Sequence, residues 1–316
     1  MYIAITGATG FLGRYIVRRL ADAGHRLRCW HRPTSDRGGF DEMADKIEWR
    51  LGDLGDVAST ASLVQGVDAV VHAAVDWEGP RNRQFERQPG RGQQAGQGDY
   101  FEDFIAHNLM GSLRLFQAAF TAGVQRFVHI STCAVHEVIL EDRPLDETHP
   151  LWATSHYGAH KGALEKFVHS FGFGQGWPIC ALRPTGIYGL AHPASQSRWY
   201  DLVGQVLRGE PISSSRGGKE VHAADVARAV EVLLGADAST IAGQAYNCYD
   251  MYVAEQDVAG IAKQLSGSSS VIADLNRGPK HQIVTAKIRK LGMTFAGSEI
   301  LRQTVAALVR AHGGKG

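Results

Sequence analysis

The sequence predicts an α/β fold, with a doubly wound parallel sheet and a small, mostly helical C-terminal lobe. Short apolar runs alternate with amphipathic runs through the first 186 residues, which is typical of a parallel sheet. One predicted strand, AVVHAA at 69–74, is apolar throughout, as expected in a sheet covered on both faces. The length of 316 residues leaves room for a second, smaller unit.

The expected elements follow one another regularly up to residue 183. Strands are predicted at 2–6, 26–30, 47–51, 69–74, 126–131 and 179–183. Helices are predicted at 11–23, 59–65, 109–122 and 155–171, the first and third followed by glycine. Residues 76–98 are rich in Gly, Gln and Arg and lack an apolar period, which predicts a long or partly disordered loop.

The pattern changes after Tyr188. Prolines and the polar run SSSRGGK at 213–219 predict irregular structure. A helix at 224–234 and a short strand near Tyr246 are expected next, followed by mostly helical structure from Val253 onward. We expect these later segments to build the smaller lobe.

Composition excludes several classes of function. Lys and Arg total 33 against 32 Asp and Glu, so the formal charge of +1 provides no basic field for nucleic acid. No apolar run approaches the roughly 18 residues that span a bilayer, and no leader precedes the first strand, so we expect a cytoplasmic protein without a membrane role. The four cysteines lie far apart, which predicts free thiols and no metal site.

A glycine-rich run, TGATGFLG at 6–13, joins the first predicted strand to the first helix. Gly7 can adopt a backbone conformation that a side chain would forbid. Gly10 lets a pyrophosphate approach the main chain, and Gly13 allows the helix to pack close to the sheet. Free N–H groups at the helix start then meet the phosphates. The run therefore predicts a dinucleotide site, with cofactor contacts from Gly7, Thr9, Gly10, Phe11, Leu12 and Gly13.

The TGxxGxxG spacing resembles that of the short-chain dehydrogenase/reductases. The form TGATGFLG resembles their extended branch, the NAD(P)-dependent epimerase/dehydratase proteins. The resemblance implies a Rossmann domain, 1–186 with 221–248, and a substrate lobe, 187–220 with 249–316. It also implies a homodimer formed through the helices at 109–122 and 155–171.

The second predicted strand ends in RCWHRP at 28–33, where NAD-binding proteins place an acid. Arg32 can instead pair with a 2′-phosphate, so we expect NADP to be preferred, with NAD possible if Arg32 is only an exposed loop residue. The resemblance places Asp53 and Leu54 beside the adenine. It also gives the cofactor room at Ala73 and Ala74 and sets Pro184 along the nicotinamide.

The run YGAHK places Tyr157 and Lys161 on one helix face. A lysine one turn away favours the phenolate and lowers the pKa of tyrosine, which suits Tyr157 to general acid–base work at a carbonyl or alcohol. The resemblance implies that Lys161 also binds the ribose hydroxyls of the cofactor. It implies as well that Thr132, in the run ISTCAVHE, bonds the substrate oxygen. Ser131 is the alternative to Thr132, whose hydroxyl could instead bond the turn's backbone.

Two departures from the family's pattern bear on the substrate. Nucleotide-sugar enzymes often carry an arginine where this chain has Gly218-Lys219-Glu220, although Arg216 or Lys219 could substitute. Dehydratases place Asp-Glu where this chain has Cys133-Ala134, so sugar 4,6-dehydration is not expected.

The sequence predicts an NAD(P)-dependent oxidoreductase that transfers hydride at the carbonyl or alcohol carbon of a small molecule. Two alternatives remain open. One is a redox-neutral, NAD-dependent epimerase of a sugar or nucleotide-sugar. The other is a non-catalytic NADP-sensing protein.

Overall fold

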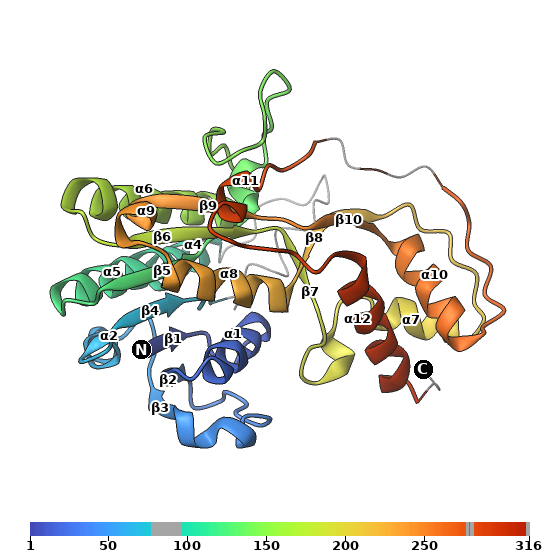
Figure 1. The fold of residues 1–316 in the computed structure, drawn as a ribbon, viewed down its shortest axis with the longest axis horizontal. Coiled ribbons are helices and arrows are strands. Elements are labelled where there is room, and N and C mark those ends of the chain that lie inside the picture. Colours follow the sequence, from blue (N-terminus) through green and yellow to red (C-terminus); the bar gives the residue numbers. More distant parts are fainter. Residues whose placement is uncertain (77–96, 276–277, 279–280, 314–316) are drawn as a thin grey trace.

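The computed structural model describes residues 1–76, 97–275, 278 and 281–313. Its centre is a seven-stranded sheet in the order β3-β2-β1-β4-β5-β6-β9, in which every neighbouring pair is parallel (Figure 1). The predicted doubly wound parallel sheet is confirmed. Its strands are β1 (Tyr2–Thr6), β2 (Arg26–His31), β3 (Ile47–Leu51), β4 (Ala69–His72), β5 (Arg126–Ile130), β6 (Ile179–Pro184) and β9 (Gln244–Cys248).

Helices cover both faces of this sheet because its strands are apolar on both faces. Ile3 and Ile5 of β1 pack with α1 (Phe11–Asp22) and α8 (Ala223–Gly235). Ala4, between them, faces the layer of α2 (Val57–Val64), α5 (Gly111–Thr121) and α6 (His156–Gln175). The carboxyl ends of the strands are left to form a binding edge, as in other open parallel sheets.

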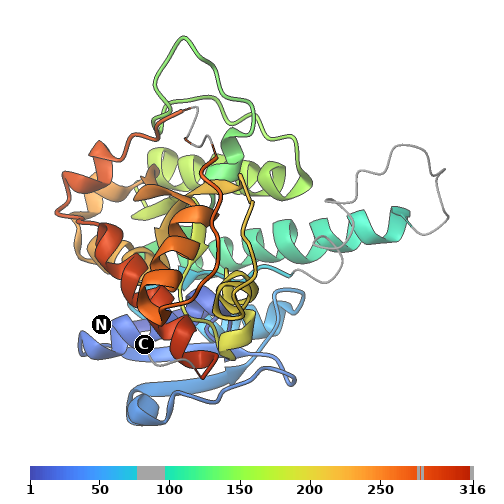
Figure 2. The same cartoon turned by 90° about the vertical axis from the view of Figure 1, so that its right-hand side faces the viewer.

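The helix predicted at 109–122 belongs to a longer helical run. α4 (Gln97–Phe104), the π-helix η2 (Ile105–Met110) and α5 follow one another without a break. In Figure 2 this teal run extends beyond the rest of the molecule. Most of the loop predicted at 76–98 lies outside the described residues, and its last two residues already belong to α4.

A second sheet belongs to the smaller lobe. β10 (Met251–Ala254) pairs antiparallel with β8 (Gly217–His222), which pairs in parallel with β7 (Gly186–Tyr188). The irregular structure predicted at 213–219 is therefore wrong for its last residues. Gly217 and Gly218 look like turn signals in the sequence but are strand residues. Glycine is needed at 217 because a Cβ there would overlap the Tyr252 side chain.

Three helices complete the lobe beside the large sheet: α7 (Tyr200–Leu207), α10 (Glu255–Ser266) and α12 (Gly297–Ala311) (Figure 1). They share a separate apolar core with Tyr188 and Trp199. The chain returns to the large sheet at α11 (Ala286–Arg289), where Ile288 joins the α1–α8 core. The division into two domains at the predicted boundaries stays a prediction.

The remaining short elements connect these layers. They are η1 (Asp41–Lys46), η3 (Cys133–His136), η4 (Ala194–Gln196) and α9 (Ala238–Ile241). Within the described ranges, no helix combines the length and apolar character needed to cross a membrane.

Candidate active site

A cavity of about 980 Å³ lies at the carboxyl edge of the large sheet. Every residue predicted for the site lines it, although the predicted residues come from segments spread over the first 184 positions. In the described part of the chain, no group of three His, Cys, Asp or Glu side chains is placed to hold a metal ion. The predicted residues that line the cavity are Gly7, Thr9, Gly10, Phe11, Leu12, Gly13, Arg32, Asp53, Leu54, Ala73, Ala74, Thr132, Tyr157, Lys161 and Pro184.

The glycine-rich turn has the shape that an anionic cofactor requires. Gly7 has a φ of 72°, and a Cβ there would lie 2.8 Å from the Ala74 nitrogen. A Cβ at Gly13 would overlap the Gly7 carbonyl oxygen, so α1 can approach the turn only with glycine there. Gly10 caps α1 without a side chain, and the first turn carries no acid. The unpaired N–H groups of this helix start therefore fit a pyrophosphate.

The end of β2 presents a cation and a hydroxyl to the cavity. Ser35 Oγ accepts a hydrogen bond from the Arg32 backbone N–H at 2.9 Å, and both residues line the cavity. The Arg32 guanidinium also lies 3.9 Å from a carboxylate oxygen of Asp76. Asp36, the acid nearest to Arg32 in sequence, instead accepts hydrogen bonds from the side chain of Arg14 at 3.2 Å and from the Gly38 N–H at 2.8 Å.

The ends of β3 and β4 form the next part of the wall. The Asp53 carboxylate accepts a hydrogen bond from the Gly55 N–H at 2.7 Å, and Leu54 beside it is buried. The Ala74 N–H donates to Thr6 Oγ1 at 3.2 Å, which ties the end of β4 to β1. These contacts fix the backbone of the predicted adenine side while leaving only small side chains at 73–74.

Tyr157 lies in the first turn of α6, which is firmly anchored. Ser155 caps the helix by accepting a hydrogen bond from the Gly158 N–H at 3.0 Å, and the Glu137 carboxylate accepts from the Ser155 N–H at 2.7 Å. A Cβ at Gly158 would lie 2.5 Å from the Ala134 carbonyl oxygen. The missing side chain therefore lets α6 approach the turn that follows Thr132.

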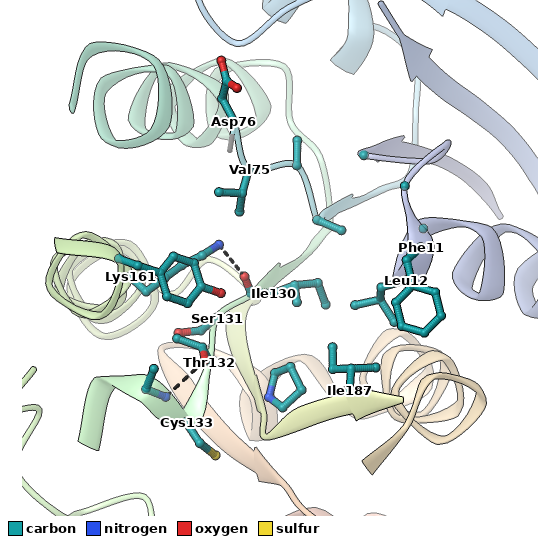
Figure 3. Close-up of a pocket in the computed structure, with 18 of the residues that line it drawn as sticks. Phe11, Leu12, Val75, Asp76, Ile130, Ser131, Thr132, Cys133, Lys161 and Ile187 are labelled. Atoms are coloured by element: carbon teal, nitrogen blue, oxygen red, sulfur yellow. Dashed lines mark hydrogen bonds between the residues drawn. The ribbon is translucent and has the colours of Figure 1, made fainter. Parts of the chain in front are cut away.

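Lys161 lies one helical turn beyond Tyr157 and is buried. Its Nζ donates a hydrogen bond to the Ile130 carbonyl oxygen at 2.7 Å (Figure 3). Burial lowers the pKa of Lys161 to about 7, and the nearby Glu165 carboxylate opposes this shift. Burial likewise lowers the pKa of His160 to about 3, and the Lys161 charge adds to this shift. Lys161 thus gives up its proton far more readily than an exposed lysine.

The two hydroxyls after β5 have different partners. Thr132 Oγ1 accepts a hydrogen bond from the Ala134 N–H at 3.1 Å (Figure 3), the backbone contact considered as the alternative to a substrate role. Its own O–H can still be donated. Ser131 Oγ instead donates to Glu165 Oε1 at 2.5 Å, and Glu165 forms a buried ion pair with Arg183, also at 2.5 Å. Ser131 is thereby bound into the protein interior.

The cavity is also lined by residues that were not predicted as site residues, although the sequence suggests Lys219 as a possible phosphate contact. Leu145 and Ile283 form an isolated parallel bridge, in which the Val284 N–H donates to the Leu145 carbonyl at 3.0 Å. Their contact depends on tertiary structure and leaves no local signal. Ser35 could have been found from the sequence, because it follows Arg32-Pro33 at the spacing of a turn whose serine hydroxyl bonds the backbone. The further lining residues include Ser35, His107, His136, Ile139, Leu145, Thr185, Ile187, Gln196, Lys219 and Ile283.

Comparison with known proteins identifies the family. The model of the NAD dependent epimerase/dehydratase family matches residues 3–88 and 90–248 of this chain. The chain belongs to this family. The resemblance drawn from the glycine-rich run and YGAHK is confirmed.

Curated relatives of this epimerase/dehydratase-family chain carry names of different enzymes. A 3 beta-hydroxysteroid dehydrogenase/Delta 5-->4-isomerase of Mycobacterium tuberculosis is 29% identical over 66% of this chain and 52% of its own. A Bacillus subtilis protein named as an uncharacterized UDP-glucose epimerase is 26% identical over 74% of this chain and 73% of its own. The chain thus spans about half the length of the hydroxysteroid dehydrogenase.

Solved structures share the fold over nearly the whole chain. A dTDP-glucose 4,6-dehydratase mutant from Streptomyces venezuelae, with NAD bound, has a TM-score of 0.73 at 24% identity and covers 98% of this chain and 97% of its own. A UDP-glucose 4-epimerase from Thermotoga maritima has a TM-score of 0.75 at 20% identity and covers 99% of this chain and 100% of its own. The Rossmann-type sheet with a C-terminal lobe is therefore shared with enzymes of this family.

Proposed function

We propose that this chain is an NAD(P)-dependent oxidoreductase that acts on a carbonyl or alcohol carbon of a small molecule. The observation that carries the proposal is that Thr132, Tyr157 and Lys161 line the same cavity as the glycine-rich turn. A proton-transfer group beside a dinucleotide site is what hydride chemistry at a carbon–oxygen bond requires. The relatives named as dehydrogenases and epimerases support this chemistry.

The residues divide the work as follows. When bound, the nicotinamide supplies or accepts the hydride. Tyr157 donates a proton to the carbonyl oxygen during reduction, or accepts one from the alcohol during oxidation. Lys161 lies on the same helix face and favours the phenolate while it is charged. Thr132 donates its O–H to the substrate oxygen, since the hydrogen bond that it accepts from the Ala134 N–H leaves its proton available.

A conservative substitution tests Tyr157. We expect Tyr157→Phe to lower kcat/KM for NADPH-dependent reduction of a panel of ketones and aldehydes by about 100-fold to 10,000-fold, the range of general acid–base catalysis. NADPH affinity, measured by nicotinamide fluorescence, should remain unchanged. Full activity in the variant would contradict the role given to Tyr157. An inactive wild type that still binds cofactor would favour the NADP-sensing alternative.

The preferred cofactor is proposed to be NADP. Support comes from the end of β2, where Arg32 and Ser35 line the cavity while Asp36 is engaged by Arg14 and Gly38. A guanidinium suits a 2′-phosphate, whereas NAD-binding proteins usually place a carboxylate there. We expect Arg32→Ala to weaken NADPH binding by about 10-fold to 100-fold, as loss of a charged hydrogen bond does.

The same titration with NADH separates this proposal from the epimerase alternative. NADH binding should be unchanged in Arg32→Ala, because NADH lacks the 2′-phosphate. NAD(H) that copurifies with the wild type and cannot be removed would instead favour redox-neutral epimerisation, which keeps its cofactor through the cycle. The homodimer predicted through α5 and α6 stays a prediction.

A further inference from the structure

Lys219 lines the same cavity as the proposed catalytic residues and has no counter-ion among the residues that the structure describes. It is half-buried, and within the described ranges no hydrogen bond or ion pair reaches its ammonium. Its charge lies within electrostatic reach of the Cys133 thiol, one residue after Thr132, and burial lowers the pKa of Lys219. A partly desolvated cation without a partner costs free energy that an anionic ligand would recover.

The geometry of the small sheet explains why the neighbouring acid does not neutralise Lys219. Glu220 is buried and bonds the Arg198 guanidinium at 2.7 Å. A Cβ at Gly186 would overlap the Glu220 carboxylate, so Glu220 covers the Gly186 face of the sheet. Because side chains alternate along a strand, Lys219 lies on the opposite face, together with Ile187. Ile187 points toward the cavity in Figure 3.

A hydroxyl accompanies this cation. Gly186 of β7 is paired in parallel with Glu220 of β8. Thr185, one residue before Gly186, therefore lies level with Lys219, one residue before Glu220. Thr185 Oγ1 is buried and has no hydrogen-bond partner among the described residues. Thr185 also lines the cavity. A buried hydroxyl without a partner is costly unless a ligand bonds it, and a hydroxyl can donate to an anion.

The cavity that Lys219 lines also has aliphatic residues in its wall. Ile139, Leu145 and Ile283 line the same cavity, and the bridge between Leu145 and Ile283 holds two distant chain segments together there. Leu145 is 5% exposed. A ligand that bonds Lys219 and extends along this cavity to these residues would contact aliphatic side chains, which favour an apolar body over a sugar covered with hydroxyls.

We infer that the substrate is a carbonyl or alcohol compound with an apolar body and a single anionic group, a carboxylate or a phosphate monoester, bound by Lys219 and Thr185. The inference rests on the proposed oxidoreductase function and specifies its substrate class. One ammonium matches one anionic group. The diphosphate of a nucleotide-sugar would bring two charged phosphates to the one ammonium of Lys219.

The test compares ligands that differ in charge and share an apolar body. The probes are 3-phenylpropanoate, its neutral amide 3-phenylpropanamide, and 2-phenylethyl phosphate, titrated into NADPH-loaded protein by calorimetry. We expect wild type to bind the carboxylate or the phosphate at least about tenfold more tightly than the amide. Lys219→Met should remove this difference without weakening the amide. Lys219→Arg should retain the difference, and Lys263→Met on α10 serves as the matched control.

The outcomes separate the two proposals. Equal affinity for acid, phosphate and amide in wild type would overturn the inference, as would an anion preference that survives in Lys219→Met. Failure of all three probes to bind at millimolar concentration would overturn it too. NADPH titration of the same samples is the independent check. A protein that binds neither NADPH nor NADH would contradict the proposed function itself.

Discussion

The ammonium group of Lys161 is enclosed by protein and hydrogen-bonded to a backbone carbonyl. Its pKa of about 7 lies well below the value near 10.4 of a lysine in an unfolded chain. Between these two values the unfolded chain binds more protons than the folded chain. The free energy of unfolding must therefore rise with pH in this window.

This linkage gives a prediction for Lys161→Met. Relative to the variant, wild type should gain stability as pH rises from about 7 to about 10, by at most about 1.4 kcal/mol per pH unit. Below pH 7 the difference should be constant, because Lys161 is protonated in both states. Urea unfolding of both proteins across this range measures the effect. A difference that does not change with pH would contradict the burial-driven shift.

At the residue scale, the sequence predicted candidate site residues where chemistry imposes their spacing, and their roles stay predictions. Tyr157 and Lys161 could be found because one helical turn separates them, and Gly7, Gly10 and Gly13 because a phosphate turn requires them. The cavity brings these residues together. Leu145 and Ile283 could not be found, because an apolar residue on a loop gives no indication of its tertiary partner.

The α6 element depends on a glycine that allows it to approach the turn after β5. At Gly158, a Cβ would lie 2.5 Å from the Ala134 carbonyl oxygen and 2.8 Å from the Ala153 Cβ. Added atoms in such tight packing force the backbone apart. The displacement would move Tyr157 away from Thr132.

We therefore expect Gly158→Ala to lower the free energy of unfolding by about 1–3 kcal/mol and to reduce kcat/KM together with it. Gly174→Ala on the same helix is the matched control, because nothing lies within 4 Å of its added Cβ. At position 174, the higher helix propensity of alanine should raise the free energy of unfolding by up to about 1 kcal/mol. Denaturant unfolding of both variants checks the pair. Equal effects would show that the packing at Gly158 is not restrictive.

Elements were predictable where the hydrophobic period was uninterrupted. The strands of the large sheet were found because each has apolar residues at its centre, as in IAI of β1, AVV of β4 and CAL of β6. β8 was not found, because Gly217 and Gly218 precede charged residues and read as a turn. The early start of the α4–η2–α5 run was also missed, because α4 follows directly on a polar stretch that carries no helical period.

The lobe and the large sheet are joined at the start of α12. The Asp250 carboxylate, between β9 and β10, accepts a hydrogen bond from the Gly297 N–H at 3.0 Å. Asp225 of α8 accepts from the Ala296 N–H at 3.1 Å. Carboxylates at a helix N-terminus satisfy its free N–H groups and complement its dipole. Asp225, on a helix that packs against the large sheet, and Asp250, between the two sheets, therefore fix the first turn of a lobe helix.

Asp250→Ala should loosen this junction. We expect faster amide hydrogen exchange in the first turn of α12, corresponding to a loss of about 0.5–2 kcal/mol, with strands β1 and β4 unaffected. Asp250→Asn retains a hydrogen-bond acceptor, so the first turn of α12 should lose less stability than in Asp250→Ala. Asp237→Ala is the control, because Asp237 makes no capping hydrogen bond to α9. Unchanged exchange at 297–300 in Asp250→Ala would show that the contact does not hold the helix.

The bridge between Leu145 and Ile283 also matters for protein engineering. Part of the cavity wall comes from Ile139, Leu145, Lys219, Ile283 and residues 185–187, whereas the glycine-rich turn and the Tyr157–Lys161 pair lie on other segments. Substitution libraries at Ile139, Leu145 and Ile283 should therefore change substrate preference while the proposed proton-transfer residues, Tyr157 and Lys161, are kept. The fold provides a modular scaffold, in which substrate preference can be redesigned while the chemical step is kept.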